Sequence, residues 1–430
     1  MNTGLIILFV IILIALFVVG APIWVAFSLG AICFILGIVH SPVQNIPMVF
    51  FNACDSYTMM AIPFFMFAGS IMAYGGASKY IFRVVNSFFG KRKGGLAITA
   101  VVMSMIYAAI TGSSSATLAG VAELAKPEMQ KQGYKNDFIA SLYAAACTLG
   151  QMIPPSILMI LYGTMVGANT GDLFIAGVIP GIISGIVLCV VAWYCSPKVD
   201  PAVAAELDYM YNAKFRMKAL LQGIPALFMP IAVLGAIYAG IVTPTEAGAL
   251  ACVYGVFLTL IYREFKWDTF KKTFNSALRS NAMIFILVAA AILFANPITY
   301  MRVPQLISEW VVAMGLGQKA FIWACIILFL ILGMFIDVIP ILYLTIPALY
   351  PALVALDVNL IQFNIILILC LQIGQMSPPF GTALYIASGI CDASVTDTAK
   401  GIVKYIVAYV AVLVLIVYVP VLSTFLPNLL

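Results

Sequence analysis

The sequence predicts an all-α polytopic membrane protein built from an inverted repeat. Hydrophobic residues make up 64% of its 430 residues and charged residues only 9%, whereas soluble domains carry about 25% charged residues. Several apolar runs, among them 23–39, 173–193 and 402–422, approach or exceed the ~20 residues that cross a bilayer. A short phrase ending in two prolines also occurs twice.

The first apolar run, Leu5 to Val19, could be read as a secretory signal or as a spanning helix. No Lys or Arg occurs before Lys79, so the basic region of a signal is missing and we favour a spanning helix. The scattered cysteines and the single His40 suit packing better than a metal site. The net charge of +5 is spread over short loops, which favours cytoplasmic loops over a nucleic-acid surface.

Basic residues gather in a few connections and are nearly absent from the others. By the positive-inside rule the basic connections face the cytoplasm, and they are 79–93, 126–135, 198–218, 263–279 and 400–404. We count about ten full spans plus two hairpins, with both termini outside. The stretches 205–221 and 262–279 are amphipathic, and we expect helices along the cytoplasmic interface, with solvated linkers as the alternative.

Two segments read as re-entrant helical hairpins. Segment 95–125 lies between two basic clusters, so both of its ends face the cytoplasm, and it is short for two crossings. Segment 320–350 has the same length and flanks poor in positive charge, so we expect it to enter from the outside. Because irregular backbone at membrane depth must be buried in protein or line a wet cavity, the two tips are expected to line one cavity.

The repeated phrase is GQMIPP at 150–155 and GQMSPP at 374–379, an offset of 224 residues. The same offset places Ser113 opposite Asp337. Opposite orientations of the two copies, as the charges indicate, are the pattern of inverted repeats in secondary transporters. The alternative is a pair of unrelated proline kinks.

Each Pro-Pro pair predicts a broken helix. Proline lacks an N–H group and disfavours helix at the residue before it, so carbonyls near 150–153 and 374–377 lose their helical partners. Freed carbonyls suit a dehydrated Na⁺ ion, and the N–H groups of the next half-helix suit an anion.

The two hairpin tips add polar groups to an apolar setting. Five of the seven residues in 111–117 carry hydroxyls, which predicts oxygen ligands, with close helix packing as the alternative. Asp337 lies among apolar residues, and an intramembrane carboxylate indicates a functional site; helix–helix contact is its alternative. Glu246 begins a helix, where we expect it to cap.

Motifs along almost the whole chain carry a family resemblance. They are TGSSSATLAGVAELAKPEM at 111–129, IPPSILMILYG at 153–163, LFIAGVIPGI at 173–182, TPTEAGA at 243–249, and the stretch from GMFIDVIP at 333 to PPFGTALY at 378. Together they resemble the large membrane subunit of TRAP transporters (tripartite ATP-independent periplasmic transporters), of the DctM or SiaM type.

The resemblance implies an elevator-type fold in the bacterial inner membrane, with scaffold helices in 1–94, linker, arm and further scaffold helices in 197–319, and two transport-domain repeats in 95–196 and 320–430. Each repeat would hold a hairpin, a broken helix and a further helix. The broken helices are 137–166 and 363–390, and the further helices 173–196 and 402–425.

The resemblance also implies how the protein works. A Na⁺ gradient would drive import without another cofactor, a periplasmic binding protein would deliver the substrate, and a separate small four-helix membrane subunit would join the scaffold. The substrate would be an organic carboxylate, first a sialic acid and second a C4-dicarboxylate. A stand-alone Na⁺/carboxylate symporter of the same fold is the alternative. No GxSxG, HExxH or Walker A motif indicates an enzyme.

Carried over residue by residue, the resemblance implies two Na⁺ sites with the substrate between them. The first would use Gly112, Ser113, Ser114, Ser115, Gly150, Gln151, Met152, Ile153 and Pro154. The second would use Gly333, Asp337, Gly374, Gln375, Met376, Ser377 and Pro378. The substrate would contact Ser115, Thr117, Pro155, Ser156, Ser377, Pro379 and Thr382. Ser377 departs from the family pattern, where a Thr precedes the Pro pair, and no arginine is expected in the cavity.

Overall fold

A computed structural model of the chain describes residues 11–12, 15–16, 19–39, 42–90, 93–197 and 213–429, none of which forms a strand. The helices within these ranges are α2 (Ile23–Phe34), η1 (Ile35–Val39), α3 (Asn45–Cys54), η2 (Thr58–Met60), α4 (Ala61–Tyr74), α5 (Ala77–Phe89), α6 (Gly95–Thr111), α7 (Ser114–Lys131), α8 (Asn136–Cys147), η3 (Thr148–Gln151), α9 (Ile157–Val166), α10 (Thr170–Cys195), α12 (Ala213–Tyr238), α13 (Pro244–Ile261), α14 (Trp267–Tyr300), α15 (Val303–Ala313), α16 (Gln318–Gly333), α17 (Val338–Ala355), α18 (Leu360–Met376), α19 (Thr382–Cys391), α20 (Val395–Tyr418) and α21 (Val421–Leu429). The protein is an all-α polytopic membrane protein.

Six of the described helices are long and apolar enough to cross a membrane, and a seventh span results if α3 and the segment Thr58–Tyr74, bent by 61°, count as one. The expected count of about ten included the two broken helices, whose halves are too short to cross alone, the run 23–39, whose helix is also too short, and the run 5–19, most of which lies outside the described residues. The six helices in turn include α17, which was expected as half of a hairpin.

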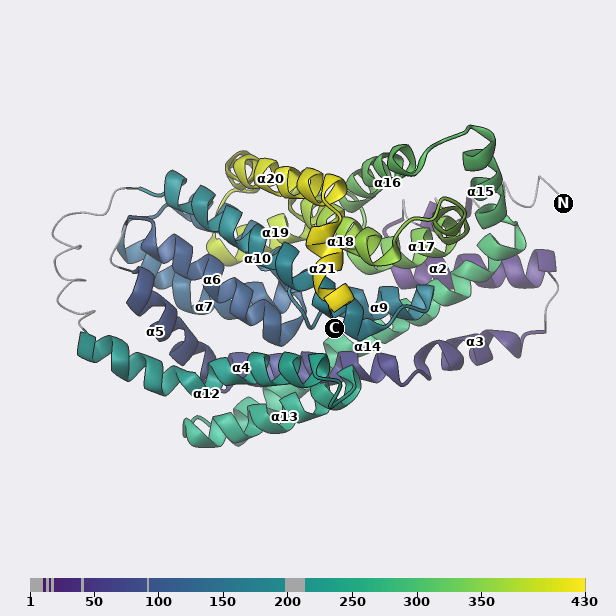
Figure 1. Ribbon diagram of the computed structural model, residues 1–430. Coiled ribbons are helices and arrows are strands. Elements are labelled where there is room, and N and C mark those ends of the chain that lie inside the picture. The colour runs from purple at the N-terminus through teal and green to yellow at the C-terminus, as the bar shows by residue number, and fades with distance from the viewer. Residues whose placement is uncertain are drawn as a thin grey trace.

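Both predicted hairpin segments form a helix–turn–helix. In the first, α6 and α7 meet at Gly112, whose φ of +60° is a left-handed conformation that glycine adopts easily. In the second, α16 and α17 are joined by residues 334–337. Figure 1 shows the two hairpins at opposite ends of the molecule with their turns toward its centre. Entry of these hairpins into a membrane remains a prediction.

Both predicted broken helices are interrupted at the repeated phrase. The first consists of α8, η3 and α9, and the second of α18 and α19. The halves pack crosswise, with α8 against α19 and α9 against α18. Gln372 Nε2 donates to the Thr148 carbonyl at 2.7 Å, and the Thr148 and Tyr409 hydroxyls are 2.9 Å apart. The interrupted ends are therefore held in one buried layer.

Three expected helices differ in extent. Residues 262–279 form no separate interfacial helix, because from Trp267 they belong to α14, which continues to Tyr300. The described part of 205–221 begins α12 in the same way, and 205–212 lie outside the described residues. The helix expected over 402–425 is divided into α20 and α21 at Pro420, because proline cannot donate to the helical ladder.

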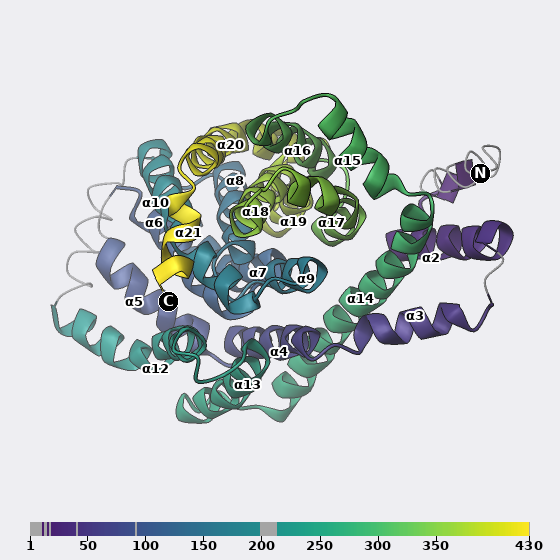
Figure 2. The ribbon, with the colours of Figure 1, turned by 45° about the vertical axis from the view of Figure 1, so that its right-hand side comes forward.

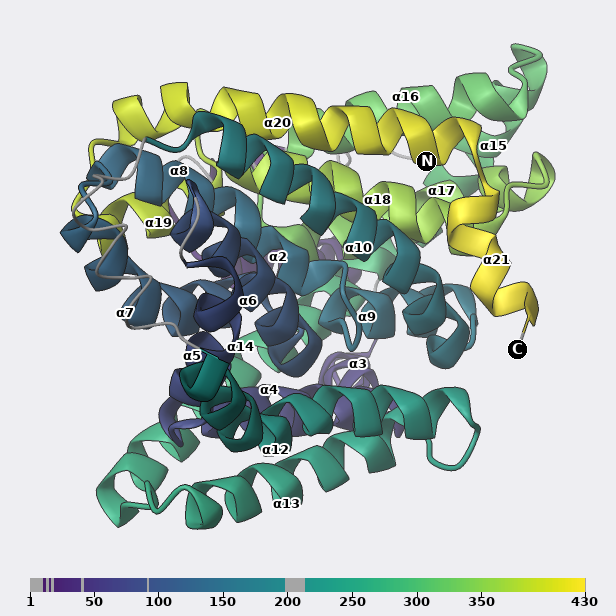
Figure 3. The same cartoon turned by 60° about the vertical axis from the view of Figure 1, so that its left-hand side comes forward.

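A second group of helices flanks the hairpin bundle. α4 packs against α13, α5 against α12, and α12 against α13; in Figure 3, α12 and α13 lie together on the side away from α16 and α20. Figure 2 shows α14 crossing the molecule, and it contacts α2, α3 and α4 as well as α17. Thr243 and Glu246 form a reciprocal capping box at the start of α13, which confirms the capping role expected for Glu246.

The close approach of the second break to the second hairpin gives a test of this packing. A Cβ atom added to Gly374 would lie 2.5 Å from Gly333 Cα, whereas one added to Gly389 would meet nothing within 4 Å. We expect Gly374→Ala to lower the free energy of unfolding by about 1–3 kcal/mol, the usual cost of overpacking.

Thermal unfolding in detergent measures the effect, with Gly389→Ala in α19 as the matched control. The control should leave the midpoint unchanged or raise it slightly, because alanine is the better helix former. Equal midpoints for the two variants would contradict the described contact.

Candidate functional site

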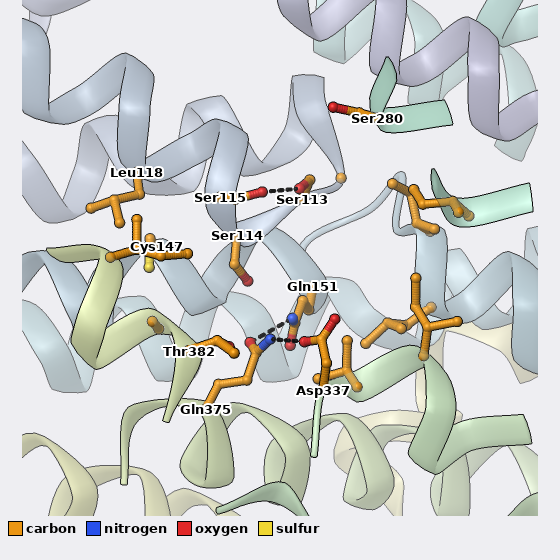
Figure 4. A pocket seen from close by; sticks show the side chains of 18 of the residues that line it. Ser113, Ser114, Ser115, Leu118, Cys147, Gln151, Ser280, Asp337, Gln375 and Thr382 are labelled. Carbon is orange, nitrogen blue, oxygen red and sulfur yellow. Dashed lines mark hydrogen bonds between the residues drawn. The ribbon is translucent and has the colours of Figure 1, made fainter. Parts of the chain in front are cut away.

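The two turns and the two helix breaks surround one cavity of about 300 Å³. Figure 4 shows side chains from both hairpins and both broken helices converging there. Its lining is Met66, Gly112, Ser113, Ser114, Ser115, Leu118, Cys147, Gln151, Ile157, Leu158, Ser280, Met283, Ile284, Asp337, Val338, Ile339, Gln375, Thr382, Ala383 and Ile386.

The first turn presents hydroxyl groups to the cavity. Ser113 precedes α7 in an extended conformation, but its side chain makes no capping hydrogen bond. Its Oγ lies 3.2 Å from Ser115 Oγ instead. Thr117 points away from this group, because its hydroxyl is buried 2.9 Å from that of Thr111. The turn therefore keeps three serine hydroxyls at the cavity, and a threonine pair supports it from behind.

The second turn presents a carboxylate in the equivalent place. Asp337 precedes α17 as Ser113 precedes α7, and its side chain makes no capping hydrogen bond either. Asp337 Oδ1 accepts a hydrogen bond from Gln375 Nε2 at 3.3 Å. Of the described residues that line the cavity, Asp337 alone carries a charge. The site is therefore rich in oxygen and negative.

The two helix breaks contact each other through the side chains of Gln151 and Gln375. Gln151 Nε2 donates to Gln375 Oε1 at 2.6 Å, so equivalent residues of the two repeats touch each other. Each break also lies close to its own hairpin: a Cβ on Gly150 would be 2.7 Å from the Ser113 carbonyl oxygen, and Gly374 faces Gly333. Glycine is needed at both places because the backbones approach so closely.

Eight of the predicted site residues line the cavity together. They are Gly112, Ser113, Ser114, Ser115, Gln151, Asp337, Gln375 and Thr382. The other predicted residues do not line it, namely Thr117, Gly150, Met152, Ile153, Pro154, Pro155, Ser156, Gly333, Gly374, Met376, Ser377, Pro378 and Pro379.

Two serines next to the helix breaks donate hydrogen bonds to the interrupted backbone. Ser156 Oγ donates to the Gln151 carbonyl and Ser377 Oγ to the Ile373 carbonyl, both at 2.6 Å. Each serine hydroxyl thus satisfies a carbonyl beside its own break. Because its hydrogen is used in that bond, the hydroxyl can only accept a further hydrogen bond.

Part of the cavity wall was not predicted from the sequence. Met66 of α4 and Ser280, Met283 and Ile284 of α14 complete the lining. The spacing of the three α14 residues places them on one helix face, but they follow directly on the stretch interpreted as an interfacial helix. Cys147, interpreted as a packing residue, also reaches the cavity.

The arrangement is suited to a small cation together with a polar ligand. Hard monovalent and divalent cations prefer carboxylate, carbonyl and hydroxyl oxygens, and these are the groups that Asp337 and the serine turn supply. The described lining holds no basic side chain, so positive potential for an anion would come from helix-terminal N–H groups or from a bound cation.

Comparison with known proteins gives close relatives over nearly the whole length. A C4-dicarboxylate TRAP transporter large permease protein DctM of Vibrio cholerae is 32% identical, over 98% of this chain and 97% of the relative. The sialic acid TRAP transporter large permease protein SiaM of Vibrio cholerae is 27% identical, over 95% of each. The isethionate TRAP transporter permease protein DctMQ of Oleidesulfovibrio alaskensis is 34% identical over 95% of this chain, which spans 64% of that relative.

A solved structure and a protein family agree with this picture. The YdaH transporter of Alcanivorax borkumensis superimposes with a TM-score of 0.63 at 12% identity, over 87% of each chain, which shows a shared fold. Residues 10–422 match the family described as "Tripartite ATP-independent periplasmic transporter, DctM component". Because that match spans nearly the full sequence, the chain belongs to the DctM component family of tripartite ATP-independent periplasmic transporters.

Proposed function

We propose that this chain is the large transmembrane subunit of a Na⁺-coupled TRAP transporter that imports an organic carboxylate across the bacterial inner membrane. The observation that carries the proposal is the cavity in which two turns and two helix breaks converge around the single carboxylate of Asp337. Among the substrates named for the relatives, C4-dicarboxylates, sialic acid and 2,3-diketo-L-gulonate are carboxylates and isethionate is a sulfonate. The first two are our expected substrates.

The negative charge of the cavity supports coupling to a cation, which we propose to be Na⁺. An ionised Asp337 repels a carboxylate substrate, and at a separation of about 4 Å the interaction of two unit charges near a protein surface is about 4 kcal/mol. One bound Na⁺ neutralises this carboxylate, and a second one gives the site a net positive charge that attracts the substrate. Substrate and Na⁺ then each raise the affinity of the site for the other, because coupling between two ligands is reciprocal.

An elevator movement is consistent with the composition of the cavity wall. Most of the lining comes from the hairpins and broken helices, and Met66 and Ser280 come from α4 and α14 of the flanking group. We propose that the hairpin bundle moves past this wall and carries its contents with it. A periplasmic binding protein would supply the substrate, and a small four-helix subunit would bind the flanking group.

Uptake into proteoliposomes tests the whole proposal. We expect uptake of sialic acid or a C4-dicarboxylate by this chain with its small subunit when a Na⁺ gradient is imposed and the binding protein is present. A K⁺ gradient should give none. Na⁺-driven uptake without the binding protein would support a stand-alone symporter, and uptake independent of Na⁺ would contradict coupling.

Replacing the one charged group of the cavity tests the ion site directly. We expect Asp337→Asn to reduce Na⁺ affinity by at least about tenfold, because losing the charge of a cation ligand removes more than ~1.4 kcal/mol. The shift of the thermal unfolding midpoint with increasing Na⁺, compared with K⁺, measures this affinity.

Glu309→Gln provides the matched control, because it removes an exposed carboxylate of α15 that does not line the cavity. It should retain the Na⁺-dependent shift of the unmodified protein. A full Na⁺-dependent shift in Asp337→Asn would remove Asp337 from the ion site.

A further inference from the structure

Two polar atoms at the cavity lack a hydrogen-bond partner among the residues that the structure describes. They are Gln151 Oε1 and Ser114 Oγ, both buried. Leaving a buried polar atom unpaired costs about 1–3 kcal/mol, so such atoms are uncommon in native proteins and need an explanation. Because both atoms belong to residues lining the same cavity, a ligand in that cavity is the natural partner.

The orientation of the Gln151 amide follows from Asp337. An ionised carboxylate only accepts hydrogen bonds, so Gln375 must turn its Nε2 toward Asp337, and the two atoms are 3.3 Å apart. Gln375 Oε1 then faces the other way, where it accepts from Gln151 Nε2 at 2.6 Å. This series of hydrogen bonds ends at Gln151 Oε1, an amide oxygen that can only accept a hydrogen bond. The two glutamines are 5% and 6% exposed, so little solvent reaches them.

Ser114 offers the complementary capacity. A serine hydroxyl can donate as well as accept, and Figure 4 shows Ser114 pointing toward the glutamine pair. A bound cation could take both oxygens as ligands. An organic ligand satisfies both residues when it donates to Gln151 Oε1 and accepts from Ser114 Oγ. An alcohol does both with one oxygen atom. A carboxylate only accepts and a methylene does neither.

We infer that Gln151 and Ser114 are specificity-determining residues that bind a hydroxyl group of the substrate. The carried molecule is therefore a hydroxylated organic acid, which narrows the proposed function and rests on it. An acid without hydroxyls leaves both atoms unpaired, and sites built to bind a substrate hydroxyl discriminate strongly against analogues that lack it. A cavity of about 300 Å³ lies at the lower end of ligand pockets, which are ~300–1,000 Å³.

Direct binding to the purified chain with its small subunit tests this inference without selection by a binding protein. Affinities are measured in Na⁺ for two matched series of dicarboxylates: succinate, malate and tartrate, and adipate with glucarate. We expect at least one hydroxylated acid to bind about tenfold or more tightly than its parent. In Ser114→Ala and in Gln151→Met this advantage should fall below about threefold.

Ser184→Ala serves as the control, because it removes a buried α10 hydroxyl that bonds the Pro180 carbonyl away from the cavity; it should keep the full preference. Ser114→Ala changes one atom, so the test stands even if Gln151→Met fails to fold. Na⁺-dependent binding without hydroxyl preference would overturn the inference and leave the proposed function intact. If Gln151→Met binds Na⁺ more weakly but keeps the preference for hydroxylated acids, Gln151 is a Na⁺ ligand, and the inference is overturned as well. Failure of all these acids, and of sialic acid measured beside them, to bind in Na⁺ would overturn both.

Discussion

The structure depends on keeping interrupted backbone buried at its centre. Each Pro-Pro pair removes donors that a continuous helix would use, and unpaired carbonyls at membrane depth are too costly to face lipid. The chain satisfies them with its own groups, as when Ser156 and Ser377 donate to carbonyls beside the breaks. The hairpin turns carry the same cost, and packing turns and breaks against one another covers most of this backbone, with residues 378–380 and Phe335 left exposed. The cavity is the space left where these polar pieces meet.

The two repeats are alike in backbone and unlike in charge. Their glutamines Gln151 and Gln375 meet each other, and Thr148 and Gln372, again 224 residues apart, are joined by a hydrogen bond. At the hairpin turns, however, the first repeat has Ser113 where the second has Asp337. The same local architecture thus offers hydroxyls on one side of the cavity and a carboxylate on the other. Any two cation positions built on it would differ in charge and in affinity.

The sequence predicted the hairpins and breaks because these depend on local chemistry. Glycine and hydroxyl runs make turns, proline pairs end helices, and the offset of 224 residues related the two copies. Helix continuity was harder to predict, since the charged residues of 267–279 do not reveal that α14 continues through them. Tertiary contacts could not be predicted at all. The repeat indicated that Gln151 and Gln375 are equivalent, but only the packing of the two copies brings their side chains together, and only α14 places Ser280 at the cavity.

In the proposed function, bound cations and hydroxyl recognition make separate contributions to substrate selection. A site whose described lining carries one negative charge and no positive one repels an acid, and in the function we propose bound cations remove that repulsion. Cations can distinguish a dianion from a monoanion, but they do not distinguish acids of equal charge. Discrimination needs groups that are paired by one acid and left unpaired by another. Gln151 Oε1 and Ser114 Oγ meet this condition, and Asp337 fixes the amide orientation that creates the first of them. In this proposal Asp337 therefore has two roles: its charge favours a bound cation, and its hydrogen bond to Gln375 sets the amide orientation that leaves Gln151 Oε1 free for a substrate hydroxyl.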